Sequence, residues 1–276
     1  GISLTVSDDN FSHINKFEFP SINNDRVTPF IERWKNTKGP GAELADFQSF
    51  TIELCDLLGV PIPDPKSDST NDNQYIFERP VDSFTIEGER KASKNRIDLY
   101  RRDCFVMEGK QTGLKIGSQG WNNAMQKAKN QADNYVRSLP VEEGRPPFII
   151  VVDVGSCIQI YSEFSRSGGI YAPFPDPSHY LIKLEDLVKL PIQQRLQALW
   201  LAPESLDPSK YAAKVTKDLS LKLAKLAKSL EESGYEVVRI AHFLKRCLFT
   251  MFSEDVELIP ESVSYTHLTL PTIYSV

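Results

Sequence analysis

The sequence predicts an α/β domain followed by an all-helical segment, and three observations lead to this fold class. Residues 96–100 and 104–111 alternate between apolar and polar side chains on either side of a polar turn, as two adjacent strands do. Residues 147–154 form a continuous run rich in β-branched side chains, which is typical of a strand buried on both faces. From Leu187 onward the pattern is helical only. We therefore expect a sheet-containing region and a separate helical one.

The elements before the central strands follow from apolar spacing and from chain-breaking residues. Residues 1–28 are polar and irregular, so we expect a flexible N-terminal extension. The predicted elements after it are a short helix that begins at Phe30, a long amphipathic helix from Ala42, and strand segments at 75–81 and 83–86. Gly59 and the two prolines that follow it end the long helix.

The elements after the central strands complete the predicted domain. A second amphipathic helix is predicted at 121–139, and strands are predicted at 147–154, 157–164 and 180–184. Because the pattern changes at Leu187, we expect one domain at 29–186 and a helical spacer at 187–262.

The last residues match neither neighbouring pattern. Residues 263–268 resemble translated sequencing-adapter DNA, so we expect 263–276 to be a non-native tail. The chain would then be the N-terminal piece of a longer protein, and its helical spacer would be incomplete.

The central strands carry a candidate catalytic group. Glu108 and Lys110 are two residues apart on one predicted strand, so their side chains point to the same face, and Asp98 lies on the neighbouring strand. Carboxylate oxygens are preferred ligands of hard divalent cations such as Mg²⁺. A bound ion of this kind polarises a phosphoryl oxygen and lowers the pKa of a bound water, which the lysine can orient. Two carboxylates and a lysine at a strand end therefore suit phosphodiester hydrolysis.

The spacing of these three residues, Asp-x9-Glu-x-Lys, resembles the PD-(D/E)xK nuclease motif. The same separations arise by chance in many chains of this length, and the alternative is a hairpin with a solvated, charged face. Gln131 and Tyr135, four apart on the second helix, resemble the additional motif of the RecB-like branch of that superfamily. The alternative for this pair is a packed tyrosine beside a solvated glutamine.

Three further residues have two interpretations each. Glu43 lies in the first turn of the long helix, where it is either a metal ligand or a complement to the helix dipole. Asp153 ends the buried strand, where it is either a site residue or, more simply, a turn former. Lys115 lies in a glycine-rich loop at 112–120 that faces substrate or is merely exposed, and this loop lacks the phosphate-binding GxxxxGK[ST] pattern.

Composition limits the class of protein. The chain has 276 residues and a net charge of −5, but residues 88–137 contain eleven Lys or Arg against five Asp or Glu. This local excess suits a polyanionic substrate, although a solvated face is an equally good interpretation. The four cysteines form no CxxC pair, and no apolar run approaches eighteen residues. We therefore expect a cytoplasmic protein with reduced cysteines and no membrane segment.

The resemblance to one enzyme family extends beyond these motifs. The chain is similar to the start of the MmeI-like, type IIL restriction–modification enzymes over roughly residues 29–262. The matching positions are Phe30 and Trp34, Glu43–Pro61, Phe77–Val81, Arg96–Tyr100, Phe105–Gln111, Gln131 with Ala132 and Tyr135, Pro146–Phe148, Asp153–Gly155, Ala241–Leu244 and Phe252–Pro260. Ile97 replaces the proline that usually precedes the motif aspartate. The resemblance implies a PD-(D/E)xK restriction-endonuclease-like core, in which a central mixed sheet is flanked by helices, followed by a helical spacer.

The resemblance also implies a function and its residues. It implies an Mg²⁺-dependent DNA endonuclease module in which Asp98 and Glu108, with Glu43, hold the metal, and Lys110 and Gln111 complete the catalytic group. Arg96, Lys115, Gln131 and Tyr135 would support the site or the DNA.

Such a module is one part of a single polypeptide that also contains an adenine-specific DNA methyltransferase and a target-recognition domain. The expected partners are double-stranded DNA and the rest of that polypeptide, which would bind S-adenosylmethionine. This chain contains no Asn-Pro-Pro-Tyr methyltransferase motif. The alternative function is a catalytically silent DNA-binding or interaction module of a DNA methyltransferase.

Overall fold

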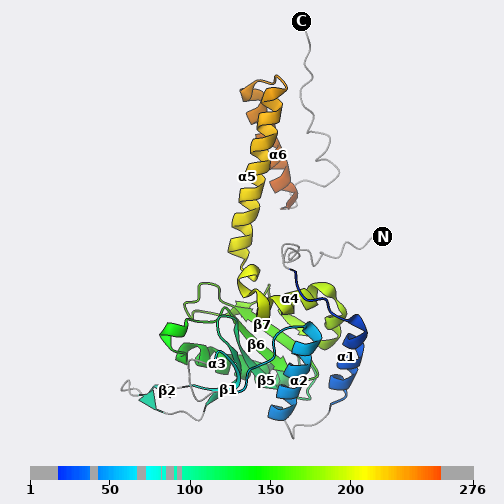
Figure 1. Cartoon of the computed structure of the whole chain (residues 1–276), viewed down its shortest axis with the longest axis vertical. Coiled ribbons are helices and arrows are strands. Elements are labelled where there is room, and N and C mark those ends of the chain that lie inside the picture. Colours follow the sequence, from blue (N-terminus) through cyan, green and yellow to red (C-terminus); the bar gives the residue numbers. More distant parts are fainter. Residues whose placement is uncertain are drawn as a thin grey trace. The chain divides into compact units, whose positions relative to one another are not determined.

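The computed structural model of the chain describes residues 18–37, 43–66, 73–81, 83–84, 90–91 and 95–255 (Figure 1). These residues fall into two units, which divide between Asp207 and Pro208. The strands are β1 (Tyr75–Pro80), β2 (Ser83–Phe84), β3 (Arg90–Lys91), β4 (Arg96–Arg101), β5 (Phe105–Lys110), β6 (Phe148–Asp153), β7 (Cys157–Ser162), β8 (Ala172–Pro173) and β9 (Leu181–Lys183). The α-helices are α1 (Val27–Lys35), α2 (Glu43–Leu58), α3 (Gln119–Ser138), α4 (Leu190–Leu201), α5 (Pro208–Glu232) and α6 (Val237–Asp255). Short 3₁₀ turns occur at Asn24–Arg26, Val141–Glu143, Leu184–Val188 and Pro203–Leu206.

The first unit is built on a mixed sheet. Its strand order is β1-β4-β5-β6-β7-β8, and β9 also pairs with β7. β5 and β6 are parallel, and the other neighbours in this sheet are antiparallel. Parallel neighbours require a crossover connection, and α3 supplies it between β5 and β6. The α/β class and the mixed sheet flanked by helices are thus confirmed.

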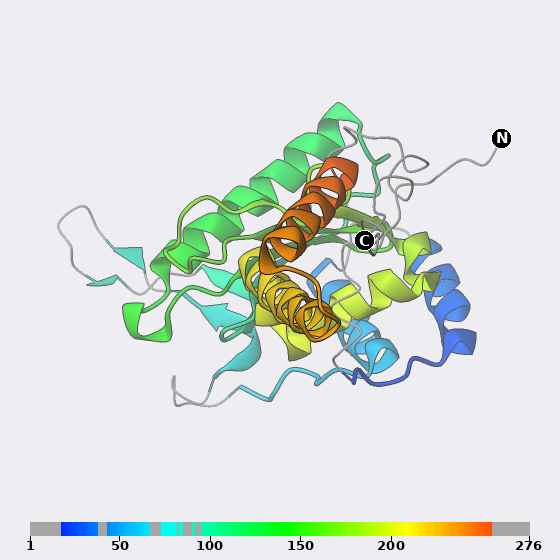
Figure 2. The ribbon, with the colours of Figure 1, turned by 90° about the horizontal axis from the view of Figure 1, so that it is seen from above.

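Both faces of the sheet are covered, as Figure 2 shows. On one face Phe105 and Met107 of β5 join a core with α1, α2 and α4. On the other face Val106 joins a second core, which lies under α3. The strand β6 is buried along its whole length and alternates between the two cores in the same way. This explains its continuous apolar sequence, because a strand covered on both sides has no solvent face.

The boundary of the first unit lies later than the sequence predicted. Helix α4, expected at the start of the spacer, packs in the core that contains Phe105 and Met107, called here the main core. The centroid of the Trp200 ring lies 4.7 Å from that of the Phe105 ring, and the Trp200 indole N–H donates to the Tyr75 hydroxyl at 2.9 Å. The buried Gln197 amide donates to the Leu58 and Pro20 carbonyls, each at 2.8 Å. The spacer predicted at 187–262 therefore differs from the structure, in which the division follows Asp207.

The N-terminal prediction is also corrected for the residues that the structure describes. Val27 is 1% exposed and begins α1, while Phe19 and Ile22 pack against the main core. Phe19, Ile22 and Val27 therefore attach this segment to the core, although most of residues 18–28 are exposed. Residues 1–17 lie outside the described part, as does the tail predicted at 263–276.

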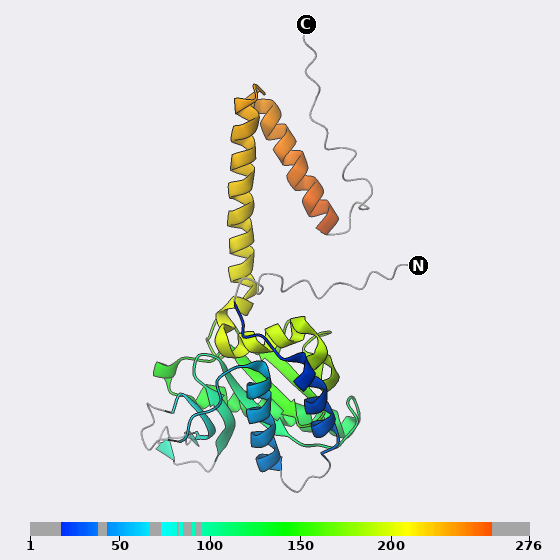
Figure 3. The same cartoon turned by 45° about the vertical axis from the view of Figure 1, so that its right-hand side comes forward.

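The second unit contains α5 and α6, two helices joined by a short turn (Figure 3). Gly234 adopts φ +88°, and the Tyr235 N–H bonds back to the Leu230 carbonyl, which ends α5 in the way that a C-terminal glycine allows. Leu230 and Ile240 are buried. Among the described residues, no helix combines the length and the apolar character that crossing a bilayer requires.

Candidate active site

Asp98 and Glu108 are brought together by the antiparallel pairing of β4 and β5. Leu99 pairs with Met107, so Asp98 and Glu108 occupy the next opposed position of the two strands. One carboxylate oxygen of Asp98, Oδ2, accepts a hydrogen bond from the Gly109 N–H at 2.8 Å. Two residues ten apart in the sequence are therefore neighbours at one end of the sheet.

Glu108 is the most unusual side chain of the site. It is 0% exposed, and neither of its carboxylate oxygens makes a hydrogen bond of good geometry with a described residue, although the backbone N–H and the carboxyl of Asp98 lie close to it. Burial, followed by the nearby charge of Asp98, raises its pKa to about 9. A buried carboxylate without well-placed donors is costly, so this position favours a proton or a cation in place of the missing partner.

The pKa of Asp98 is also raised. Burial raises its pKa above the ordinary value, while the Gly109 N–H and the Lys110 ammonium act against that rise. Its carboxylate therefore stays closer to ionisation than that of Glu108, since it has a backbone donor and a cation nearby. The two acids differ in environment although they are opposite one another.

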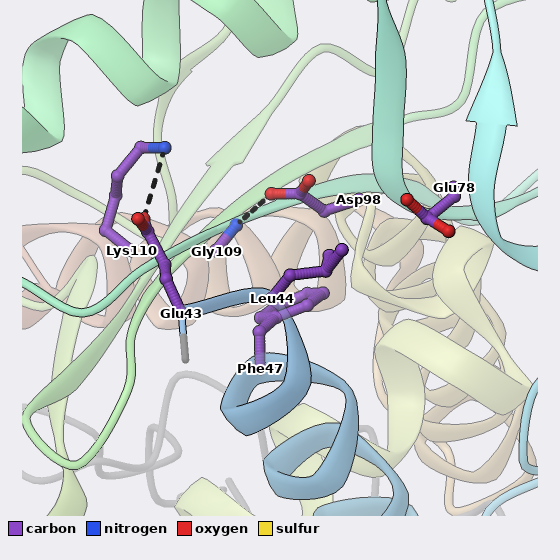
Figure 4. Close-up of a pocket in the computed structure, with 7 residues that line it drawn as sticks. All are labelled: Glu43, Leu44, Phe47, Glu78, Asp98, Gly109 and Lys110. Atoms are coloured by element: carbon purple, nitrogen blue, oxygen red, sulfur yellow. Dashed lines mark hydrogen bonds and ion pairs between the residues drawn. The ribbon is translucent and has the colours of Figure 1, made fainter. Parts of the chain in front are cut away.

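Lys110 ends β5 and faces the N-terminus of α2 (Figure 4). Its Nζ lies 3.5 Å from Oε1 of Glu43, the first residue of that helix. The helix can approach because Gly109 has no side chain: a Cβ at this position would lie 2.3 Å from Cδ2 of Phe47. Gly109 thus allows α2 to present Glu43 to the lysine rather than to the two carboxylates of the sheet.

A pocket of about 330 Å³ opens at this end of the sheet. Its lining residues, drawn in Figure 4, are Glu43, Leu44, Phe47, Glu78, Asp98, Gly109 and Lys110. Sequence reasoning did not single out Glu78 as a site residue. It occupies β1 opposite Asp98, and its φ of +50° is rare for a residue with a side chain. Pairing the strands at 75–80 and 96–101 would have revealed this neighbour, whereas its backbone conformation has no sequence signal.

Gln111, Gln131 and Tyr135 extend the site toward α3. Gln111 is 9% exposed, and neither polar atom of its amide has a partner among the described residues. Gln131 donates from Nε2 to the Tyr135 hydroxyl at 2.9 Å, so the predicted i, i+4 pair is in direct contact. Burial raises the pKa of Tyr135, and Glu108 contributes to the rise, which places the tyrosine within electrostatic reach of that carboxylate.

The remaining predicted residues lie at the periphery. Arg96 is exposed at the start of β4 and pairs with Pro80 of β1, and Lys115 is exposed in the loop between β5 and α3. No described contact joins either of them to the carboxylates.

Two of the basic residues that the structure describes within the segment 88–137 make contacts away from the carboxylates. Arg101 lies three residues after Asp98, at the end of β4, where its guanidinium lies 4.5 Å from the centroid of the Tyr75 ring. Lys129 is paired with Asp133 at 2.5 Å. The local positive field predicted for 88–137 stays a prediction, because residues 88–89 and 92–94 lie outside the described part of the chain.

The carboxylates of Asp98 and Glu108 suit a hard divalent cation that takes few ligands from the protein. Among the described residues, no three His, Cys, Asp or Glu side chains are close enough to form a complete metal cage. Mg²⁺ usually keeps several waters and takes one or two carboxylates from the protein. Asp98 and Glu108 can supply such a pair, and the buried oxygens of Glu108, which make no hydrogen bond of good geometry among the described residues, provide the observation from the structure that fits an ion there.

Comparison with protein-family models matches residues 23–233 to the model described as MmeI, N-terminal domain. The match spans the mixed sheet, its helices and all of α5. Comparisons with curated proteins and with solved structures gave no match.

Proposed function

Since the chain belongs to the family of MmeI N-terminal domains, we propose that its first unit is the DNA endonuclease module of a restriction enzyme. The proposed reaction is Mg²⁺-dependent hydrolysis of a phosphodiester in double-stranded DNA. The proposed site is the end of the sheet at which β4, β5 and the start of α2 meet. The larger polypeptide proposed for this module would add an adenine-specific methyltransferase, which binds S-adenosylmethionine, and a target-recognition domain.

The observation that carries the proposal is the fully buried carboxylate of Glu108 opposite Asp98, whose oxygens make no hydrogen bond of good geometry among the described residues. A protein that used this sheet only as a scaffold would gain stability from an apolar side chain at position 108, because a buried acid without well-placed donors is unfavourable. Groups that are unfavourable for folding concentrate at functional sites. Lys110 at the rim of the pocket then completes the acid, acid and lysine set that phosphodiester hydrolysis needs.

Each residue has a proposed role that its position supports. Asp98 and Glu108 would hold Mg²⁺, which when bound supplies Lewis-acid stabilisation of the charge on the phosphate. Lys110 would orient the attacking water or balance phosphate charge, and its 3.5 Å contact with Glu43 holds the ammonium at the pocket rim. Gln111 would donate from its unpartnered amide to the water or phosphate. Gln131 would fix the Tyr135 hydroxyl, which is within electrostatic reach of Glu108.

Two measurements test the proposal. Mg²⁺ titration of the chain by calorimetry should show binding that Asp98→Asn and Glu108→Gln abolish. Nicking of supercoiled plasmid, by the chain and by a longer polypeptide that contains it, should require Mg²⁺ and should fall by about a hundredfold or more in Lys110→Ala, since one lost electrostatic group commonly costs that much.

Lys35→Ala is the matched control, because Lys35 is also a partly exposed lysine paired with a glutamate, at 2.5 Å from Glu185. Surface pairs of this kind contribute little, so cutting by the control should equal that of the wild type. Wild-type protein that binds Mg²⁺ no better than Glu108→Gln, or that cuts no faster than Lys110→Ala, would contradict the nuclease assignment. That result would favour a silent DNA-binding module instead.

A further inference from the structure

Asp153 is a buried acid to which the proposed reaction assigns no role. It ends β6 and is 1% exposed. Its Oδ1 accepts from the Thr112 N–H at 2.8 Å, and its Oδ2 accepts from the Thr112 hydroxyl and from the Trp121 indole N–H, each at 2.9 Å. The carboxylate therefore joins three chain segments: the end of β6, the loop after β5 and the first turn of α3.

This connection lies directly beside the proposed catalytic lysine. Asp153 pairs with Lys110 in the parallel register of β5 and β6, and the Val154 N–H donates to the Lys110 carbonyl at 2.7 Å. The backbone is thus held on both sides of Gln111, at the Lys110 carbonyl before it and at the Thr112 N–H after it. The buried amide of Gln111, which has no partner of its own among the described residues, is placed by these neighbours.

Asp153 also fixes where α3 begins. The Trp121 indole is 3% exposed, and the Trp121 N–H donates to the side chain of Ser118, the N-cap residue of this helix. A carboxylate is well suited to such a junction, since it accepts several hydrogen bonds and charge-assisted bonds are stronger than neutral ones. An asparagine of the same shape would direct its NH₂ group at donors and could not satisfy all three.

We propose that Asp153 is a positioning residue of the proposed nuclease site: it sets the Lys110–Gln111 segment and the start of α3 in the arrangement that hydrolysis requires. This inference rests on the proposed function. Under this inference, the two pairs of site residues are positioned by different parts of the sheet. Asp98 and Glu108 are placed by the pairing of β4 with β5, whereas Lys110 and Gln111 depend on the end of β6.

The test compares Asp153→Asn with wild type in Mg²⁺ affinity, in cleavage kinetics and in an NMR signal. Mg²⁺ affinity should stay within about twofold, because the sheet still holds both carboxylates, while kcat for plasmid nicking should fall about 10- to 100-fold. KM for DNA should stay unchanged. The chain has three tryptophans, so the ¹⁵N spectrum has three indole signals, and Trp121→Phe identifies the one that should shift.

Asp176→Asn is the control, since Asp176 is another aspartate that accepts several hydrogen bonds, among them those from the backbone N–H groups of Ser178 at 2.7 Å and His179 at 3.1 Å, in a separate loop. It should leave all three measurements unchanged. If Asp153→Asn does not fold, Thr112→Val and Trp121→Phe each remove one of the bonds and keep the buried acid. Each should then lower kcat at constant Mg²⁺ affinity.

Three outcomes overturn the inference: wild-type kcat in Asp153→Asn, a parallel loss of Mg²⁺ affinity and kcat, or wild-type kcat in both substitute variants. Failure of the proposed function is distinguishable from these, because the wild type itself would then neither bind Mg²⁺ nor cut DNA.

Discussion

Glu108 should make the folded protein less stable as pH rises, and Glu108→Gln should remove this effect. Burial raises the pKa of this carboxyl to about 9, from an ordinary value of 4.5. Between those two values the folded state keeps the proton and the unfolded chain releases it. Raising the pH therefore favours the unfolded chain. With respect to this group, the folded protein has its full stability below about pH 4.5 and loses stability progressively up to about pH 9.

The size of the effect follows from the width of this window. Each pH unit inside it changes the free energy of unfolding by about 1.4 kcal/mol, so moving from pH 5 to pH 8 should destabilise the wild type by about 4 kcal/mol through this group. The raised pKa of Asp98 acts in the same direction. The glutamine side chain of the variant cannot ionise. From pH 5 to pH 8, Glu108→Gln should therefore gain about 4 kcal/mol of unfolding free energy relative to wild type.

Urea denaturation followed by tryptophan fluorescence measures this directly. All three tryptophans, at positions 34, 121 and 200, lie in the first unit, so the signal reports the unit that contains the site. The experiment needs both proteins at pH 5 and pH 8 without divalent metal. Glu32→Gln, an exposed glutamate on α1, is the control and should follow the wild type at both pH values.

Adding Mg²⁺ at pH 8 extends the same experiment. A ligand at a hundred times its Kd should stabilise the wild type by about 2.7 kcal/mol, and Glu108→Gln should not respond. The reasoning is refuted if the stability difference between variant and wild type is the same at pH 5 and pH 8. It is also refuted if Glu108→Gln is less stable relative to the wild type at pH 8 than at pH 5.

Two further variants test how the fold builds the site. Gly109→Ala should lose about 1–3 kcal/mol in urea denaturation, because the new Cβ would lie 2.3 Å from the Phe47 ring. Phe47→Leu should recover part of that loss in a double-mutant cycle, and strictly additive effects would contradict the close approach. A chain that ends after Asp207 should unfold cooperatively, whereas one that ends after residue 186 should not, since it lacks α4. Equal cooperativity of the two fragments in urea would argue against a core role for that helix.

Sequence patterns predicted the sheet elements well because alternation and chain breakers act locally. The strands predicted at 96–100 and 104–111 occur at Arg96–Arg101 and Phe105–Lys110, and the buried run at 147–154 forms β6. The short polar turn at 101–103 joins the two strands as antiparallel neighbours, and the observed register then places Asp98 opposite Glu108.

The position of α4 could not be predicted in this way. Its buried residues include Gln193, Arg195 and Gln197, so its sequence does not show a clean apolar stripe. These side chains bond instead to groups that are distant in the sequence; Gln197, for example, donates to the Leu58 carbonyl. A pattern of apolar spacing cannot detect a helix that is held partly by buried amides. Pro191 lies in the first turn of α4, where no N–H partner is lost, so it does not interrupt the helix.

The charge count along the chain was the least informative part of the sequence, and the reason is geometric. Arg101 lies only three residues along β4 from Asp98, but it stacks on the Tyr75 ring and is not among the residues that line the pocket. The pocket itself is lined by three carboxylates, those of Glu43, Glu78 and Asp98, and by the single ammonium of Lys110. A phosphodiester approaching these groups meets repulsion that an ion of charge +2 would offset. The local excess of acid, rather than the basic segment around it in the sequence, is thus the electrostatic feature that accords with a cation-dependent reaction on DNA.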